Sequence, residues 1–506
     1  MKYFPAKLVV TVVCVAPIYV MGLAVAAEEA PISSASEDCI ACHASTHPGI
    51  VADWKRSLHS RITPAQAMKK PKLQRRVSSE KMPENLANVA VGCAECHTMR
   101  AESHKDTFEH GDQKVHIVVS PGDCAVCHSE EATQFEQNLM SFARKNLVQN
   151  KLYETLVKSV NGIQTLQGMK TTISDPDPET NADSCYHCHG TEVQVKGKVT
   201  RDTDAGEMEF PVLEGWPNSG VGRFNTDGSK GSCSACHSRH QFAIQAARQP
   251  YTCSQCHKGP DVPAYPAFDV SKHGNLAAAL KGEWKLTEVP WTVGKDFSAP
   301  TCAVCHVSLL VNAEGEIVAK RTHQMSDRLP WRILGLIYAH PHPQSPDTSI
   351  IVNKDGIQLP TTFTNERASQ YLIDQAEMTK RRETLHKVCT SCHTSEWVKG
   401  HWKRLENTIE TSNQMTLTAT KIMLQAWDKG VAQRENLFDE AIEKQWVQQW
   451  LFYANSTRFA SAMMGADYGV FAHGRWYMAK NIQDLLDKLK VLLNMPRAAK
   501  DSPAKE

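Results

Sequence analysis

The chain has 506 residues, a formal net charge of +1, and a hydrophobic content of 41% with only 7% aromatic residues. This length allows one large domain or two to four ordinary ones. After the N-terminal segment, no stretch approaches the roughly 18 uncharged apolar residues of a membrane-spanning helix, which excludes such a helix from the rest of the chain.

Residues 1–27 have the pattern of a secretory signal peptide. Two lysines precede an apolar stretch from Leu8 to Val25, and small residues lead up to Ala27. A retained membrane anchor is the alternative, because the stretch is nearly long enough to cross a bilayer. The small residues favour cleavage near Ala27. The sequence therefore predicts an exported protein, in the periplasm or an equivalent compartment, with no transmembrane anchor after cleavage.

The most informative feature is that 16 of the 17 cysteines fall in eight copies of one pattern, Cys-x-x-Cys-His. Since 22 of the 506 residues are His, chance would place a His after a given Cys-x-x-Cys only about 4% of the time. A zinc ribbon has no use for the trailing His, and a disulfide scaffold does not need this spacing. Attachment of c-type haem requires two thioether bonds and an adjacent iron ligand. The pattern predicts eight covalently bound haem c groups.

Each predicted attachment site supplies two cysteines and one proximal His ligand. With about 60 residues per haem, the porphyrins must share a core and should lie close enough to pass electrons. Their propionates would bring the mature protein to a net charge of roughly −17, which argues against a nucleic-acid partner. The eight motifs are Cys39/Cys42/His43, Cys93/Cys96/His97, Cys124/Cys127/His128, Cys185/Cys188/His189, Cys233/Cys236/His237, Cys253/Cys256/His257, Cys302/Cys305/His306 and Cys389/Cys392/His393.

The segments between the motifs are rich in turn-forming residues. Residues 216–220 and 225–228 mark turns, and we interpret residues 220–222 as a turn rather than a phosphate loop, because no strand precedes it and no helix follows. Strand patterns are scarce, and the clearest spans Gly315 to Ala319. The predicted fold class is mainly α, a multihaem cytochrome c with a haem-packed core and little β structure.

After His393 the chain carries no haem motif. Ile442, Trp446 and Trp450 recur at helical spacing, and a second apolar stripe runs through residues 482–493. These stripes predict long amphipathic helices that cover haem faces or contact other subunits, with Trp446 and Trp450 as a plausible subunit contact. The predicted organisation is a signal peptide (1–27), an octahaem-binding domain (28–395), a helical C-terminal domain (396–495) and a disordered tail (496–506).

The distal ligands decide whether an iron atom can bind substrate. A haem with two His ligands carries electrons but leaves no room for substrate, whereas a five-coordinate haem is open. Fourteen histidines lie outside the proximal positions, enough for either outcome. The demand for ligands favours His59, His240, His273 and His323 as distal ligands. The remaining positions are contested by His110, His116, His340, His342, His386 and His401.

With these motifs in place, the chain resembles the octahaem hydroxylamine oxidoreductase family. The resemblance rests on the eight motifs, the short spacing of the fifth and sixth, the Cys-His-Ser-Arg-His run ending at His240, residues 271–274 and 299–302, and the haem-free C-terminal helices. In that family the fourth motif holds the five-coordinate catalytic haem and the other seven haems carry electrons. The resemblance implies that the open iron here is the one ligated by His189.

The chain departs from the members that oxidise hydroxylamine. Those members share an Asp-His pair after the sixth motif, and here Asp261 matches the Asp while Val262 replaces the His. They also carry a Tyr that cross-links to the catalytic porphyrin of a neighbouring subunit in a trimer, and Tyr468 lies in about this place in a different local sequence. A further departure is the 43 residues between His189 and Cys233. These differences resemble the branch of the family thought to work reductively on nitrite.

The resemblance therefore implies reduction of nitrite to nitric oxide, hydroxylamine or ammonia at the haem of His189. Asp261 would relay protons, although a turn-capping role before Pro263 is the alternative, and Arg223 or Arg239 would steer the anion or pair with a propionate. Oxidation of hydroxylamine or hydrazine is the first alternative function, and non-catalytic electron transfer is the second. The implied partners are a small nitrogen-oxide substrate, a redox-partner cytochrome or small haem subunit, and further copies in a homotrimer or a multiple of it.

Overall fold

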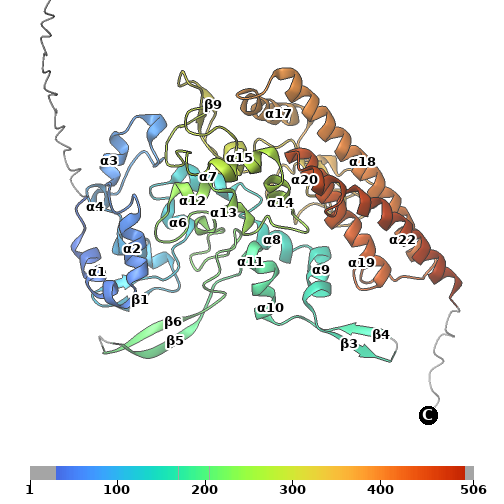
Figure 1. Ribbon diagram of the computed structural model, residues 1–506. Helices are drawn as coiled ribbons and strands as arrows, with labels where there is room; N and C mark the ends of the chain where they lie inside the picture. Colours follow the sequence, from blue (N-terminus) through green and yellow to red (C-terminus); the bar gives the residue numbers. More distant parts are fainter. Residues whose placement is uncertain (1–29, 169, 204–205, 496–506) are drawn as a thin grey trace, which may run out of the picture.

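The computed structural model describes residues 30–168, 170–203 and 206–495, and most of them lie in helices or irregular segments (Figure 1). The N-terminal part lies on the left of the view, short helices and loops fill the centre, and long C-terminal helices form the right side. The predicted mainly α class is confirmed, because the strands of the described residues form only small sheets of two or three strands. The predicted signal peptide and tail lie outside the described residues.

The N-terminal part consists of short helices joined by turns. Its first helix begins where the Ser33 side chain accepts a hydrogen bond from the backbone N–H of Ser36, at 3.2 Å. The elements are α1 (Ser34–Thr46), α2 (Pro48–Arg56), α3 (Pro64–Lys69), η1 (Lys72–Gln74), α4 (Glu84–Ala87), α5 (Cys93–His97), η2 (Ala101–Ser103), β1 (Phe108–His110), β2 (Gln113–Val115), α6 (Pro121–Cys124) and α7 (Ser129–Glu136).

The central part carries two hairpins and most of the remaining motifs. Its elements are α8 (Ala143–Val148), α9 (Lys151–Asn161), β3 (Gln164–Gln167), β4 (Lys170–Ile173), α10 (Pro178–Asp183), α11 (Cys185–His189), β5 (Gln194–Thr203), β6 (Gly206–Glu214), η3 (Cys233–Ala235), α12 (Ile244–Arg248), α13 (Pro250–Ser254), α14 (Ala264–Asp269), α15 (Lys272–Leu280), β7 (Trp291–Thr292), α16 (Cys302–His306), β8 (Leu310–Val311), β9 (Ile317–Ala319), β10 (Trp331–Arg332) and β11 (His340–Pro341).

The C-terminal part is built from longer helices, which include a π-helix, η5. Its longest helix, α18, begins where the Thr394 side chain accepts from the N–H of Trp397 and continues for 34 residues. The elements are η4 (Ser369–Tyr371), α17 (Gln375–Thr390), α18 (Ser395–Asp428), α19 (Ala441–Val447), η5 (Gln448–Ala454), α20 (Asn455–Met463), α21 (Ala466–Val470) and α22 (Arg475–Asn494).

The largest apolar core lies between these C-terminal helices. Trp446 and Trp450 are 1% and 0% exposed and pack with residues of α18 and α22. Their interpretation as a subunit contact is therefore wrong, because both side chains are buried inside their own chain. Segments of the haem-motif region, among them Ile337 to Tyr338 and Leu359, belong to the same core. The two predicted domains thus share apolar packing, and the boundary at residue 395 stays a prediction.

The strands form short antiparallel pairs and one three-stranded sheet. The predicted strand near residue 315 corresponds to β9, which pairs with β8. Strands β5 and β6 form a long antiparallel hairpin that extends from the centre of the molecule (Figure 1). This hairpin lies in the segment between the fourth and fifth motifs, for which the sequence predicted turns but no strands. Among the described residues, no helix is long and apolar enough to span a membrane.

Candidate haem sites and catalytic centre

The local structure of the motifs explains how each one presents its side chains. Three motifs form complete five-residue helices, α5, α11 and α16. One helical turn brings the two cysteines, three residues apart, to the same side of the helix. The Nδ1–H groups of His97, His189 and His306 donate to backbone carbonyls at 2.7, 3.1 and 3.3 Å. These bonds leave the Nε2 atom of each ring as the free ligand atom.

The motifs lie next to one another in space. All 16 motif cysteines are free thiols in the structure. Three pairs of thiols from different motifs are in hydrogen-bonding contact, and six further pairs are electrostatic neighbours. The contacts join Cys124 with Cys233, Cys188 with Cys256 and Cys253 with Cys302, and the neighbours are Cys39 with Cys93, Cys96 with Cys124 and with Cys127, Cys236 with Cys253 and with Cys256, and Cys305 with Cys389.

These contacts define a spatial order of the motifs. The first, second, third, fifth, sixth, seventh and eighth motifs follow one another, and the fourth joins the series at the sixth. The fourth motif, which contains His189, therefore lies on a side branch. Of the motif cysteines, only Cys42 in the first motif and Cys392 in the eighth are exposed. The two ends of the series thus lie closest to solvent.

Four pairs of histidine rings have the separation that a haem iron needs. Two imidazoles on opposite sides of one iron have ring centres roughly 6.3 Å apart, because each nitrogen lies about 2 Å from the metal. The predicted distal candidates His59, His273 and His323 each face a motif histidine at such a distance, and so does His110. The pairs are His59–His128 at 6.4 Å, His237–His323 at 6.4 Å, His273–His393 at 6.0 Å and His43–His110 at 6.1 Å.

The electrostatics of these rings suit metal ligation. Burial lowers the pKa of His59, His237 and His323 to about 4. The rings are therefore neutral at pH 7, and the neutral imidazole is the form that binds iron. The paired rings and the free thiols beside them fit a covalently attached haem c.

The second motif has two candidate partners, and hydrogen bonding separates them. The rings of His97 and His116 lie 6.1 Å apart. However, the His97 Nδ1–H donates to the His116 carbonyl, so His116 lies on the side of His97 that faces away from the free Nε2. The Nε2 of His116 is itself bonded to the Met99 carbonyl at 2.8 Å. The predicted candidate His240 is an electrostatic neighbour of His97 and is the better placed partner.

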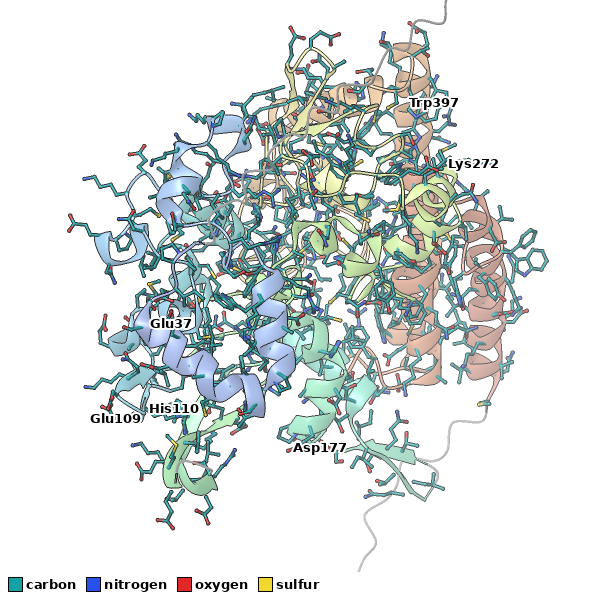
Figure 2. All side chains as sticks on the ribbon, turned by 60° about the vertical axis from the view of Figure 1, so that its left-hand side comes forward. Glu37, Glu109, His110, Asp177, Lys272 and Trp397 are labelled. Atoms are coloured by element: carbon teal, nitrogen blue, oxygen red, sulfur yellow. The ribbon has the colours of Figure 1, made fainter. Side chains whose placement is uncertain are left out.

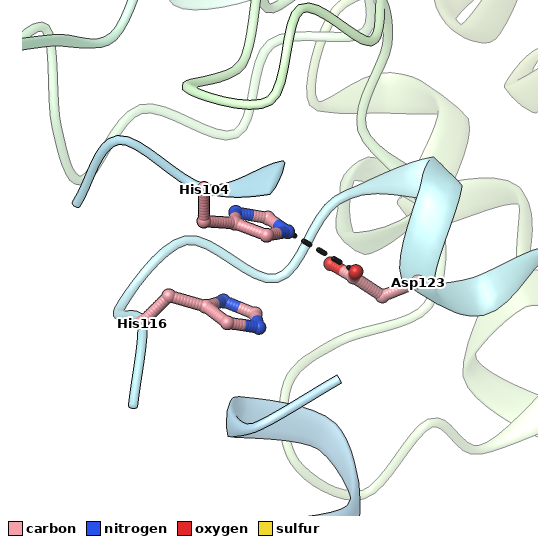
Figure 3. A group of neighbouring side chains, drawn as sticks. All are labelled: His104, His116 and Asp123. Atoms are coloured by element: carbon pink, nitrogen blue, oxygen red, sulfur yellow. Dashed lines mark hydrogen bonds and ion pairs between the residues drawn. The ribbon is translucent and has the colours of Figure 1, made fainter. Parts of the chain in front are cut away.

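A buried group of His104, His116 and Asp123 has the composition of a metal site (Figure 3). The rings of His104 and His116 are stacked 3.7 Å apart with an angle of only 4° between their planes. A metal ion must lie in the plane of each imidazole that binds it, about 2 Å from the nitrogen. Two parallel planes 3.7 Å apart share no such point. The group is therefore an ion-pair cluster, in which the His104 Nε2 contacts Asp123 at 3.1 Å.

This cluster leads to a prediction about pH and stability. Burial would lower the pKa of His104, but hydrogen bonds to Asp106 and Asp123 outweigh it and raise the pKa to about 9. The charged ring therefore contributes its whole stabilisation when the pH is below 6.5, the ordinary pKa of histidine. This stabilisation is lost as the pH rises through about 9. The His104→Gln variant should lose up to about 3 kcal/mol at about pH 6, and much less at about pH 9.5.

Thermal unfolding followed by far-ultraviolet circular dichroism measures this difference. The exposed His473 provides the control, since its ring contacts Tyr453 and Tyr477 and pairs with no carboxylate among the described residues, and a His473→Asn variant removes it. A loss of stability in His104→Gln that is the same at both pH values would contradict the ion-pair assignment.

Close backbone packing surrounds the fourth motif. Gly190, directly after His189, has a φ of +93°, and a Cβ there would lie 2.2 Å from the backbone nitrogen of Arg223. A Cβ at Gly220 would lie 2.4 Å from the nitrogen of Gly190. The turn at residues 220–222 thus packs backbone against backbone on the end of α11, where only glycine fits. This packing fixes the position of the His189 ring.

Asp261 lies beside the fourth motif, as the resemblance implies. Its charge is felt by Cys188 and His189 as well as by His257 of the sixth motif. The side chain is exposed in the polypeptide, so the chain itself does not bury this carboxylate. Its carbonyl oxygen accepts a hydrogen bond of 3.0 Å from the side-chain amide of Asn455, at the junction of η5 and α20. Nothing in the sequence points to Asn455, because only the fold brings a residue 194 positions away to this loop.

Two of the other predicted residues are held by protein contacts. The Arg223 guanidinium is 1% exposed and donates to Asn225, to the Asn218 carbonyl and to the Val119 carbonyl. Burial lowers its pKa to about 10, and its role here is to hold loops together. Arg239 is less buried and donates to Ser219 at 2.5 Å. Both guanidinium groups lie over the ring of Trp216.

Tyr468 lies on α21, which packs against α14. Its backbone carbonyl accepts from the Ser456 hydroxyl at 3.0 Å. Burial raises the pKa of its hydroxyl, and the charges of Asp467 and Asp269 add to this shift. Exposed apolar side chains, Met464, Val470 and Phe471, surround this corner of the molecule.

Comparison with known proteins adds independent information. Residues 220–330 match the family described as "Seven times multi-haem cytochrome CxxCH", and residues 123–209 match the family of cytochrome c554 and c-prime. A probable nitrite reductase-hydroxylamine oxidoreductase fusion protein of Kuenenia stuttgartiensis is 26% identical over 382 residues, which cover 72% of this chain and 35% of the relative. The chain thus spans about a third of the length of this curated relative.

Two solved structures resemble the whole fold. One, a hypothetical multiheme protein, is 39% identical with a TM-score of 0.86, over 92% of this chain and 97% of its own. The other is the Kuenenia stuttgartiensis reducing HAO-like protein complex Kustc0457/Kustc0458, which is 17% identical with a TM-score of 0.60, over 91% of this chain and 85% of its own. At this identity the second comparison establishes the fold alone.

Proposed function

Because this chain belongs to the hydroxylamine oxidoreductase-like family of multihaem c-type cytochromes, we propose that it reduces nitrite at a haem attached to Cys185 and Cys188. Seven further haems at the other motifs would carry the electrons. The observation that carries the proposal is the combination of His189 with Asp261 beside it. The hydrogen bond from Nδ1 to the Ala143 carbonyl leaves the Nε2 of His189 free, and Asp261 is exposed and forms no ion pair among the described residues.

The residues around the fourth motif have distinct tasks in this proposal. A haem held by Cys185, Cys188 and His189 would supply an open coordination position and pass electrons to the substrate. His189 is held by the Ala143 carbonyl and by the close packing at Gly190, so its ring cannot turn away. Asp261 supplies protons to the oxygen that leaves as water, and Asn455 fixes the backbone of Asp261. Electrons would reach the site through a haem at the sixth motif, whose Cys256 contacts Cys188.

The direction of the reaction follows from two side chains. A distal His would accept the protons that hydroxylamine releases, and this chain has Val262 at that position. A cross-linked Tyr would distort the porphyrin and favour electron withdrawal from a substrate, and Tyr468 lies in a different sequence context, Gly-Ala-Asp-Tyr-Gly. We therefore propose reduction of nitrite, with hydroxylamine oxidation as the second candidate.

Steady-state kinetics in both directions, with artificial electron donors and acceptors, tests the direction. We expect nitrite reduction to be faster than hydroxylamine oxidation, and the reduced protein to show the optical spectrum of ordinary c-type haems. Mass spectrometry of haem peptides should find no bond between Tyr468 and a haem. A peptide containing Tyr468 joined to the haem of Cys185 and Cys188, together with rapid hydroxylamine oxidation, would reverse the assignment.

The number of haems has its own test. We propose eight covalent haems per mature chain, because each of the eight motifs is complete and each has free thiols in the structure. Intact mass of correctly matured protein should equal the mature polypeptide plus eight haem groups. A lower mass in a fully matured sample would show that at least one motif serves another purpose.

The remaining proposals concern location and assembly. We propose export after removal of residues 1–27, because haem c is attached outside the cytoplasm. A homotrimer, or a multiple of it, follows from the family resemblance. The exposed side chains of Val470, Phe471 and Trp476 offer an apolar surface for this contact. A monomer in light scattering at micromolar concentration would contradict this assembly.

A further inference from the structure

The eighth motif is connected to the protein surface by stacked aromatic rings. The ring of Trp397 stacks on His393 with centroids 4.2 Å apart and an angle of 16°. On its other side Trp397 stacks on His401 at 5.4 Å and 3°. Trp397 is also 38% exposed to solvent. One side chain thus contacts both the motif histidine and the surrounding water.

Two unpaired cations lie near this tryptophan. Lys272 follows Ser271 and precedes His273, the ring that faces His393, and its side chain is exposed. Arg404 lies along α18 beside His401, on the same flank of the helix as Trp397. Figure 2 shows Lys272 and Trp397 on the same side of the molecule. We call the surface formed by Lys272, Trp397 and Arg404 the motif-8 face.

The charges of the motif-8 face are not neutralised within the chain. Neither of its two cations pairs with a carboxylate in the part of the chain that the structure describes, and both side chains are exposed. The exposed carboxylates nearby are Glu383 and Glu396. By contrast, Lys380 on α17 pairs with Glu377 at 3.0 Å. The motif-8 face therefore carries a positive potential.

The opposite end of the motif series has the opposite sign. Around the first motif, Glu37, Asp38 and Asp112 are exposed and have no cationic partner among the described residues. Glu37 and Glu109 lie on one side of the molecule and Trp397 on the other (Figure 2). An acidic partner protein would thus be attracted to the eighth-motif end and repelled from the first-motif end.

From these observations we infer that the motif-8 face is the docking site of a small acidic one-electron carrier protein. The inference rests on the proposed haem at the eighth motif, but not on the substrate of the fourth. In each encounter the reduced carrier loses one electron and the haem iron of the eighth motif gains it, changing from ferric to ferrous, with no exchange of atoms. Trp397 lies at the point of contact and is the side chain that connects the carrier to His393.

The composition of the face favours a transient partner over a second copy of this chain. Its large apolar side chains are few, with Trp397 at 38% and Leu276 on α15 at 40% exposure. Permanent subunit contacts are larger and more apolar, whereas encounter surfaces of redox partners are small and depend on charge. The motif-8 face matches the second type.

The test uses the full haem-loaded protein and a plant-type ferredoxin, a small acidic one-electron carrier, as the probe. We expect the double variant Lys272→Glu with Arg404→Glu to weaken ferredoxin binding by roughly tenfold at low salt, as measured by titration calorimetry. The difference should disappear at high salt, where exposed charges are screened. The matched control is Lys81→Glu with Lys151→Glu, which makes the same charge change at two other exposed lysines.

Stopped-flow reduction of the haems provides a second readout that does not depend on nitrite. Trp397→Leu should slow haem reduction by bound ferredoxin by a larger factor than it weakens ferredoxin binding. Reduction by the small molecule dithionite should remain at the wild-type rate in all variants, which separates docking from a damaged haem. Failure to reduce nitrite would contradict the proposed function and leave these results intact.

Three outcomes would overturn the inference. The first is equal weakening by the control variant, which would show a general charge effect. The second is that a basic mitochondrial-type cytochrome c binds the motif-8 face as well as ferredoxin does. The third is that the double variant changes the oligomeric state in sedimentation, which would make the face a contact between copies of this chain.

Discussion

The His189→Ala variant is expected to lose nitrite turnover by more than about 100-fold. Removing a residue that only hydrogen-bonds to a metal ligand already costs up to about 100-fold, and His189 is itself the ligand. His189 is the histidine of the fourth motif, and the Ala143 carbonyl holds its ring at 3.1 Å. Cys185 and Cys188 would still attach the haem, so intact mass should show the same number of haem groups as in the wild type. The measurement is nitrite consumption with reduced methyl viologen as electron donor.

The same motif supplies a matched control. His187 lies between the two cysteines of the fourth motif, and its side chain is exposed. His187→Ala should therefore retain nearly normal turnover, and the low-spin signals of the other haems in electron paramagnetic resonance should be alike in both variants. Retained turnover in His189→Ala would move the catalytic centre to another motif.

The second large effect concerns the apolar core of the C-terminal helices. Trp446 is 1% exposed, and its indole N–H donates to the Thr420 hydroxyl at 3.0 Å. Trp446→Ala should lower the free energy of unfolding by about 3–5 kcal/mol, because it leaves a cavity among packed helices. Chemical unfolding followed by far-ultraviolet circular dichroism measures this change.

A pair of phenylalanine variants tests the origin of the effect. Trp446→Phe removes the hydrogen bond to Thr420, whereas Trp450→Phe removes an indole N–H that has no partner in the structure. Trp446→Phe should therefore be the more destabilising of the two. If these tryptophans instead formed a subunit contact, the variants would change the oligomeric state while the unfolding of each chain stayed the same.

The haem-attachment residues could be predicted from the sequence because the chemistry fixes their spacing. Both thioether bonds and the iron ligand come from five consecutive residues, as in Cys185 to His189. Two single side chains, Asp261 and Tyr468, could be chosen only through the resemblance to a family. The structure places Asp261 beside His189 and Cys188.

The pairing of the distal histidines could not be predicted, because it depends on contacts between distant segments. His59 meets His128 and His323 meets His237, and nothing in the local sequence of either pair points to its partner. The ring of His116 shows the same limit, because its sequence position suits a ligand while its hydrogen bond to Met99 excludes that role. The helical stripe at Trp446 and Trp450 correctly indicated a helix, but periodicity alone does not distinguish an internal core from a surface between subunits.

The side-branch position of the fourth motif has a consequence for charge storage. The fourth motif joins the series only at the sixth, and the other seven motifs form a continuous series without it. A haem at each of these seven would therefore let electrons pass between the two exposed ends without involving the fourth motif. Such a protein would store several electrons, which it receives one at a time from carriers and releases only at the fourth motif. An intermediate of a multi-electron reduction could then take its next electron from haems that are already reduced, without waiting for the next collision with a carrier.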